Sequence, residues 1–255
     1  MFMRVYRLEG IPGFYKGFMP TIVSLFIISI LLIIFSDSPA PSHGTYRAPS
    51  ISIPGVLLYS LGMMILNLPR VVLTSRAITT PHRLPWFSPL TSLRLLLTPT
   101  ELRAPYTLYL TPGLLAAQSA HIAYVVLFLG TARHFLIPTP LDKIPEGEGF
   151  PTMRVLVFVA LSLGSTVVLT PLEVISTRLA IQRNHEVGGE FATLAQEDGQ
   201  GDEFAGDGED VIGLRNEEDP YHGLVDCAKS ILHEEGMAAL FRGWWVTMLA
   251  GGASL

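Results

Sequence analysis

The sequence is poor in charged residues and has a single cysteine. Asp, Glu, Lys and Arg make up 15% of its 255 residues, against roughly 25% in an average soluble domain. Because Cys227 stands alone, no intrachain disulfide forms, and the disulfide framework of small secreted domains is excluded. The first apolar run is too long for the core of a secretory signal peptide, and no small-residue cleavage site follows it. These absences favour a membrane protein.

Motifs of enzymatic chemistry and of nucleic-acid binding are also missing. The sequence contains no Gly-x-Ser-x-Gly, no phosphate-binding P-loop and no His-Glu-x-x-His, and its seven histidines do not cluster at metal-ligand spacing. The tryptophans Trp86, Trp244 and Trp245 are placed as a membrane-interface belt rather than as platforms for stacked bases. We therefore expect no enzyme, no bound metal and no nucleic-acid partner.

Hydrophobic residues make up 49% of the sequence and gather into five long runs. A helix needs about 20 residues to cross the bilayer core, and four of the runs meet this length. The fifth run stops after thirteen residues at the end of the sequence, so we expect that helix to be incomplete. The predicted membrane helices lie near 17–36, 53–78, 109–136, 152–182 and 243–255.

The connections between these runs alternate in length. The two long connections contain amphipathic stretches over 90–97 and 224–235, each predicted to form a short surface helix. Thirteen of the seventeen Lys and Arg residues lie with the long connections and the adjoining run ends, which predicts that this side faces the more negative compartment. Twelve acidic residues and one basic residue fall between Glu186 and Asp219. This composition predicts a disordered insertion over 184–219.

A phrase occurs near both ends of the chain and leads each time into an apolar run. An internal repeat of this kind indicates an array of similar units. Two further phrases, Pro171-Leu172-Glu173-Val174-Ile175-Ser176-Thr177-Arg178 and Tyr221-x-Gly223-x-x-Asp226-Cys227, stand before the second copy. In this order the phrases resemble the mitochondrial carrier family. The two copies read Glu9-Gly10-x-x-Gly13-Phe14-Tyr15-Lys16-Gly17 and Glu235-Gly236-x-x-x-Leu240-Phe241-Arg242-Gly243.

The resemblance implies an all-α membrane protein built from three repeats, each a membrane helix, a short matrix helix and a second membrane helix. Residues 1–36 then hold the end of repeat one with its second membrane helix. Residues 51–137 form a complete but degenerate repeat two. Residues 152–255 form repeat three, which carries the acidic insertion and stops within its last helix. We expect a truncated sequence with about five membrane helices, rather than a natural five-helix form.

The resemblance also implies a gate on the matrix side. In the family, a proline bends each odd-numbered helix, and an acidic residue two positions later pairs with a basic residue five positions after a neighbouring proline. Pro171, Glu173 and Arg178 fit this phrase, but Ser176 stands at the basic partner position. Glu173 is an ionisable residue within an apolar span, and such residues usually face a cavity or a partner.

The gate is incomplete in repeat two. After Pro69, Val71 and Thr74 stand where the charged residues belong. We therefore expect the basic partner of Glu173 in a preceding helix, at Arg178 or at Arg76. The alternative is that Pro69 and Pro171 bend their helices without forming a gate.

Substrate contacts in the family lie about seven to eight residues into each even-numbered helix, counted from the glycine of the repeated phrase. This count gives Ser24 in the first such helix. Counted from Thr111, it gives Gln118 and Ser119 in the second, with His121 one turn away. No Arg or Lys occupies these positions, which argues against anionic solutes. The alternative is that Gln118, Ser119 and His121 hydrogen-bond between packed helices.

Glycines at helix starts, next to aromatic and basic residues, resemble the phrases with which the family binds cardiolipin. A helix N-terminus offers backbone N–H groups and a favourable dipole to an anion. The alternative is a plain helix start at the membrane interface. The implied lipid-binding residues are Tyr15, Lys16, Gly17, Tyr221, Gly223, Arg242 and Gly243.

Two functions follow from the resemblance. The first is transport of a small solute across the mitochondrial inner membrane by a carrier-type alternating-access mechanism, by a monomer without a cofactor other than bound cardiolipin. The second is a carrier-like adaptor or fusion protein of the outer membrane that no longer transports. Glu173 and Arg178 in repeat three favour the transporter, whereas the lost charges of repeat two favour the adaptor. The sequence does not identify the substrate.

Overall fold

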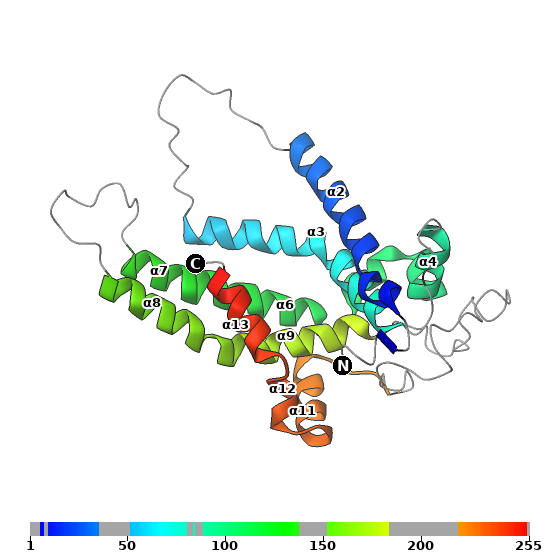
Figure 1. The fold of residues 1–255 in the computed structure, drawn as a ribbon. Helices are drawn as coiled ribbons and strands as arrows, with labels where there is room; N and C mark the ends of the chain where they lie inside the picture. Colours follow the sequence, from blue (N-terminus) through cyan, green and yellow to red (C-terminus); the bar gives the residue numbers. More distant parts are fainter. Residues whose placement is uncertain are drawn as a thin grey trace. The chain divides into compact units, whose positions relative to one another are not determined.

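Every element of the described structure is a helix (Figure 1), which confirms the expected all-α class. The computed structural model divides into two compact units: Met1–Ala48, Ile65–Leu114 and Thr177–His222 form the first, and Pro49–Met64, Leu115–Ser176 and Gly223–Leu255 the second. Each unit is considered by itself. The predicted insertion over 184–219 lies, except for its last residue, outside the described part. The described residues are 6–7, 10–35, 52–80, 84, 89–137, 152–183 and 219–253.

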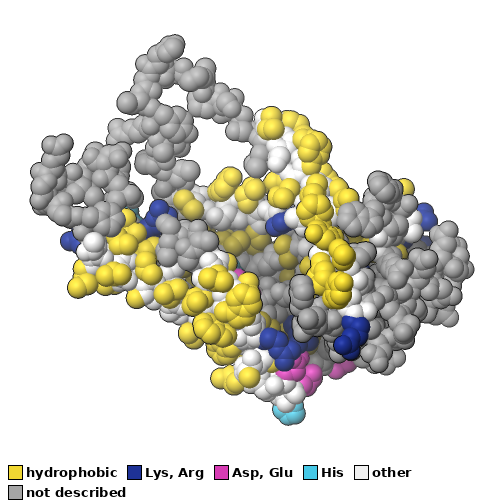
Figure 2. Space-filling view, viewed as in Figure 1, with side chains coloured by type: hydrophobic (Ala, Val, Ile, Leu, Met, Phe, Trp, Pro, Cys, Tyr) yellow, Lys and Arg dark blue, Asp and Glu magenta, His cyan; other side chains and the backbone are white. Residues whose placement is uncertain are grey.

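Four helical stretches are long and apolar enough to cross a bilayer: Gly13–Leu31, Ile53–Thr79, Leu114–Leu136 and Thr152–Ile181. They match the first four predicted spans. Within a helix every interior backbone N–H and C=O is paired, which is what a hydrocarbon environment requires. Only a third or less of each stretch is buried, and yellow apolar side chains cover α2 in Figure 2. Such apolar surface suits contact with lipid.

The spans consist of the following elements. The first span ends within α2 (Phe18–Phe35), and the second is α3 (Ile53–Thr79). The third joins α6 (Leu114–Ala123), the π-helical turn η3 (Tyr124–Leu129) and α7 (Gly130–Leu136). The fourth joins α8 (Thr152–Gly164) and α9 (Thr166–Ile181). The predicted fifth span is represented by α13 (Trp244–Ala253), whose 10 residues fall short of a bilayer crossing.

Proline is accommodated inside two of these helices, with Pro69 in α3 and Pro171 in α9. Each proline removes one backbone donor from the helix. The fourth span is also interrupted at Ser165, between α8 and α9. Ser165 is held on both sides, because its hydroxyl donates to the Leu161 carbonyl at 2.9 Å and accepts from the Tyr124 hydroxyl at 3.3 Å. The hydrogen bond from Tyr124 thus joins the π-helical turn η3 to the interruption at Ser165.

Short helices precede the membrane helices in a repeating order. The predicted surface helices are confirmed as α4 (Pro89–Leu96) and α11 (Leu224–Glu234). A second short piece follows each: α5 (Pro99–Arg103) with η2 (Pro105–Leu110) after α4, and α12 (Met237–Leu240) after α11. A similar short piece, η1 (Ile11–Tyr15), stands before α2. A short helical piece thus stands before each of α2, α6 and α13, and before α6 and α13 it follows a surface helix.

Glycine directly precedes each of these three membrane helices. Gly113 and Gly243, at φ of 80° and 86°, stand before α6 and α13, in a region that other residues rarely adopt. Gly17 stands before α2, where an added Cβ would lie 3.1 Å from the Ile78 side chain. Gly113, rather than Thr111, is therefore the counterpart of Gly17 and Gly243 in the middle of the chain.

The packed interior of each unit follows from its helix faces. In the first unit, Leu68, Val72 and Ala77 of α3 are fully buried. In the second unit α8 contacts both α7 and α13, and Figure 1 shows these helices side by side. Phe158 and Ser162 are the buried residues of α8.

Replacing Gly243 by alanine should lower the free energy of unfolding by about 1–2 kcal/mol, because alanine must then adopt a left-handed backbone. Gly62 is the matched control. It lies in α3 with open space around it, so Gly62→Ala should leave stability unchanged or raise it by about 0.5–1 kcal/mol. Denaturant titration of the two purified variants in detergent would measure both. Equal effects would contradict the assigned role of Gly243.

Candidate functional site

Glu173 forms the centre of a polar cluster in the second unit. It lies half-buried on α9, two residues after Pro171. One carboxylate oxygen accepts a hydrogen bond from the hydroxyl of Thr247 on α13 at 2.5 Å, and Thr247 is itself buried. The Ser176 hydroxyl donates to the main-chain carbonyl of Glu173 at 3.0 Å. The carboxylate is therefore oriented by a neutral donor from a second helix.

His121 brings a third helix to this cluster. It is half-buried on α6, and the Glu173 carboxylate interacts with it electrostatically. The cluster thus joins a carboxylate, an imidazole and a hydroxyl from α9, α6 and α13. These are groups that can hydrogen-bond a small polar or charged molecule. A carboxylate accepts hydrogen bonds, and the two ring nitrogens of an imidazole can donate or accept them.

A second cluster, in the first unit, is built around an ion pair. Arg76 of α3 is 2% exposed and Glu101 of α5 is 0% exposed. The two guanidinium ends of Arg76 donate to the two carboxylate oxygens of Glu101 at 2.6 and 2.9 Å. Glu101 also accepts from the backbone N–H of Thr98 at 3.1 Å, while the Thr98 hydroxyl accepts from the Glu101 N–H at 3.3 Å. This capping box holds Glu101 in place for the ion pair.

Basic side chains of this unit also satisfy carbonyls at helix ends. Arg76 donates to the carbonyl of Leu96, at the end of α4, at 3.3 Å and to that of Gln182, just beyond α9, at 2.7 Å. Lys16 donates to the carbonyl of Thr80, just beyond α3, at 2.8 Å. Helix C-termini expose unpaired carbonyls and carry partial negative charge. A cation therefore stabilises each of these three ends.

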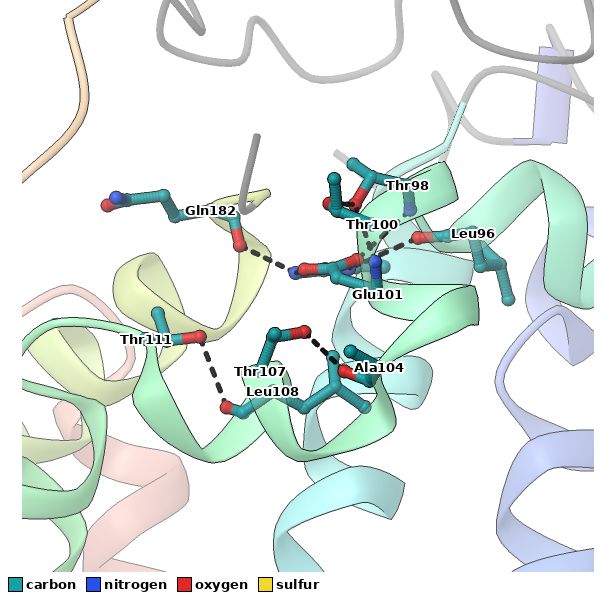
Figure 3. Close-up of polar contacts among 10 residues, drawn as sticks. Leu96, Thr98, Thr100, Glu101, Ala104, Thr107, Leu108, Thr111 and Gln182 are labelled. Carbon is teal, nitrogen blue, oxygen red and sulfur yellow. Dashed lines mark hydrogen bonds and ion pairs between the residues drawn. The ribbon is translucent and has the colours of Figure 1, made fainter. Parts of the chain in front are cut away.

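The side chain of Gln182 makes a third type of contact. Its amide donates to the Tyr221 carbonyl at 3.2 Å, and its amide oxygen accepts from the Tyr221 N–H at 3.1 Å. The main-chain carbonyl of Gln182 thus accepts a hydrogen bond from Arg76, while its side chain hydrogen-bonds the main chain of Tyr221. In Figure 3, dashed lines run from the carbonyls of Gln182 and Leu96 to the centre of this cluster, where Glu101 lies.

The predicted gate residues have different environments. Pro69 and Pro171 lie within helices, as expected. Arg76 was one candidate partner of Glu173, but its guanidinium is bound by Glu101 instead. Arg178 is half-buried in the last turns of α9. The gate itself stays a prediction.

The predicted substrate-binding residues divide between the units. Ser24 is half-buried on α2 of the first unit, and Gln118, Ser119 and His121 lie on α6 of the second. The Ser119 hydroxyl donates to the Ala116 carbonyl of its own helix at 3.1 Å, so it is already used locally. When the family count starts from the glycine before α6, its eighth residue is His121 rather than Ser119.

The predicted lipid-binding residues are only partly exposed. Lys16 and Tyr221 are buried at 9% and 6% exposure, and the Lys16 ammonium contacts a protein carbonyl rather than the surface. Gly17 packs closely against Thr74 and Ile78. Tyr15 and Arg242 are exposed. Gly223 and Gly243 directly precede α11 and α13. Cardiolipin binding stays a prediction, and Gly223, Gly243 and Arg242 are its best placed residues.

Sequence reasoning missed the two residues that complete these clusters. Glu101 was not recognised as the partner of Arg76, although Thr98-Pro99-Thr100-Glu101 has the spacing of a capping box. Thr247 was not recognised because a threonine in an apolar run carries no pattern of its own. The described residues contain no group of His, Cys, Asp and Glu that could hold a metal ion.

These features define a multi-pass helical membrane protein with a polar cluster inside its apolar helices. Residues 155–254 match the family of the mitochondrial carrier protein. The matched region runs from α8 to the end of α13, and its likeness is to the mitochondrial carriers, which are transporters of small solutes. Together with the long apolar helices it fits a multi-pass membrane protein. No curated protein and no solved structure gives a significant match.

Glu101→Gln should lower the free energy of unfolding by about 3–5 kcal/mol, because it leaves the buried Arg76 charge without its counter-charge. Denaturant titration in detergent would measure this loss. Glu235→Gln is the matched control. Glu235 lies 4.0 Å from an Arg242 side chain that is 76% exposed, so its loss should cost no more than about 1 kcal/mol.

The double variant Arg76→Leu/Glu101→Leu distinguishes the ion pair from simple packing. It removes both charges together, so it should be more stable than either single variant. Additive losses in the double variant would contradict the pairing.

Proposed function

We propose that the protein transports a small solute across the mitochondrial inner membrane by alternating access, with Glu173, His121 and Thr247 at its solute site. The match of residues 155–254 to the mitochondrial carrier family supports the transport of a solute. The observation that carries the assignment to this site is the half-buried Glu173 carboxylate, hydrogen-bonded to Thr247 and electrostatically coupled to His121.

Placing the Glu173 carboxylate in an apolar span costs free energy. An ionised group inside an apolar span is expensive, and such residues are rare unless they serve a pathway or pair with another group. A hydrophobic residue would pack in its place without that cost. Glu173 is nevertheless held by a hydroxyl from one helix and lies near an imidazole from another. Such preorganised groups on rigid helices are what a solute site requires.

Movement of α9 supplies the second part of the mechanism. Pro171 removes a backbone hydrogen bond two residues before Glu173, and Ser165 interrupts the helix one and a half turns earlier. A helix with these two irregularities bends at lower cost than a regular one. We infer that bending of α9 moves Glu173 between two arrangements, as alternating access requires. Pro171, Glu173 and Arg178 then belong to the moving gate.

The inner membrane is proposed from the charge distribution, since most basic residues lie with the long connections and positive charge favours the more negative compartment. Cardiolipin is proposed to bind where α11 and α13 begin, after Gly223 and Gly243, because helix N-termini attract anions. The exposed Arg242 supports this contact with a positive charge. The protein is proposed to act as a monomer.

The transport proposal predicts that Glu173→Gln strongly reduces solute uptake. The full chain would be reconstituted into cardiolipin-containing liposomes and tested with a panel of labelled metabolites. Loss of the carboxylate should reduce uptake about tenfold or more, as expected for a lost hydrogen bond to a charged group. Glu234→Gln, on exposed α11 surface, is the control and should leave uptake unchanged.

Two results would contradict the proposal. Full uptake by Glu173→Gln would show that this site is not used. Absence of uptake by the wild-type protein for every solute of the panel would argue against transport and would favour the adaptor of the outer membrane.

The membrane assignment has a separate test. A protease site inserted at 200 should be cut in isolated mitochondria only after the inner membrane is opened, because the long connections are expected to face the matrix. A second site inserted at 145 should be cut as soon as the outer membrane is opened. Cleavage at 200 in intact mitochondria would place the protein in the outer membrane or reverse its orientation.

A further inference from the structure

Arg70, in the first unit, is a basic residue inside an apolar span. It lies half-buried in α3, directly after Pro69 and nine residues before the span ends at Thr79. At 1.5 Å per residue it stands about 14 Å from that end, well inside a hydrocarbon core of about 30 Å. A charge at this depth is costly, and such residues usually serve a pathway or pair with another group.

The described part of the chain gives Arg70 no partner. No hydrogen bond or ion pair joins it to another described residue, and its Nε is buried. α2 carries no charged residue, and the other charged residue of α3 is Arg76. Arg76 also leaves its Nε unpaired, but its two terminal nitrogens bind the Glu101 carboxylate. Arg70 thus keeps donors that Arg76 has already used.

Two contacts define how α2 lies against α3. Gly17 packs against the Ile78 side chain, and the hydroxyls of Thr21 and Thr74 lie 3.5 Å apart. Four residues forward along α2 therefore correspond to four residues back along α3, so the two helices are antiparallel at this point.

Ser24 of α2 consequently lies at the level of Arg70. Each residue is one turn on from the contact between Thr21 and Thr74, and both are half-buried. Ser24 is also the position at which the resemblance to the carriers implies a solute contact. The count along the even-numbered helices gave no basic residue, but the neighbouring helix supplies one at this level.

We propose that Arg70 and Ser24 form a binding site for the carboxylate group of a small solute. A guanidinium binds a carboxylate through two parallel hydrogen bonds, and a serine hydroxyl can donate a third. One arginine offsets one negative charge, so a monocarboxylate fits an apolar span better than a dianionic phosphate does. The depth of Arg70 favours a diffusible solute over a phospholipid headgroup, which stays at the membrane surface.

This site goes beyond the proposed function. It uses none of the residues of the Glu173 cluster, and its test measures binding rather than transport.

Acetate and acetamide, which share a skeleton and differ in charge, provide this test. The full chain in detergent would be titrated with each at constant ionic strength while its thermal unfolding midpoint is measured. Acetate should raise the midpoint of the wild-type protein, and acetamide should not. Arg70→Gln should lose the acetate response, and Arg70→Lys should retain part of it. Ser24→Ala should weaken acetate binding about tenfold, as expected for one lost hydrogen bond to a charged group.

Arg94→Gln is the matched control. Arg94 is exposed on α4, so this variant should respond to acetate as the wild type does. Without acetate, Arg70→Gln should be at least as stable as the wild type, because it removes a charge from an apolar span. A lower midpoint of Arg70→Gln without acetate would show that Arg70 holds the fold, and would overturn the site.

Other results would also overturn it. These are an unchanged acetate response in Arg70→Gln, no acetate response in the wild type, and a midpoint raised by phosphate or cardiolipin but not by acetate. Acetate binding by a chain that takes up no solute of the metabolite panel would leave this site standing while the transport proposal fails. Uptake that depends on Glu173, without any acetate binding, would do the reverse.

Discussion

Burying a charged pair away from water is expensive, and the first unit depends on how the Arg76–Glu101 pair meets that cost. Two parallel hydrogen bonds reach both carboxylate oxygens, and the same two terminal nitrogens of Arg76 also donate to carbonyls at the ends of two helices. Arg76 therefore forms an ion pair with Glu101 and also caps the C-terminal ends of α4 and α9. Removing it would leave one buried anion and two carbonyls without donors, so the junction is expected to fail as a whole rather than by parts.

The second unit uses its charge in a different way. Glu173 accepts a hydrogen bond from the Thr247 hydroxyl, and its charge acts on the His121 imidazole. The Arg76–Glu101 pair is instead a bidentate ion pair, which suits a fixed junction. The two clusters thus place the same acidic group in different surroundings.

The sequence predicted the membrane helices well because hydrophobic length determines them directly. The four spans and the surface helices α4 and α11 appear where their apolar and amphipathic patterns placed them. The register of the middle repeat was placed less well. Its phrase lacks the usual glycine, and only the positive φ of Gly113 identifies the residue that starts α6. This shift of two residues moves the expected contact from Ser119 to His121.

The polar clusters were harder to predict, since they join residues that are distant in sequence. Arg76 and Glu101 are 25 residues apart, and Glu173 and Thr247 are 74 apart. Periodicity reports which face of a helix is apolar, but it does not report which polar side chains from different helices meet. Glu173 could be singled out from its place in an apolar run, whereas its hydroxyl partner could be found only from the folded arrangement.

The contact between Gln182 and Tyr221 has a consequence for how the chain tolerates variation. Two hydrogen bonds bring these residues together, so the polypeptide between them leaves and returns at one point. The entropy of closing such a loop rises slowly with its length, by about 0.6 kcal/mol for each doubling. A change in the length of the segment between Gln182 and Tyr221 is therefore expected to cost little stability while this contact stays intact.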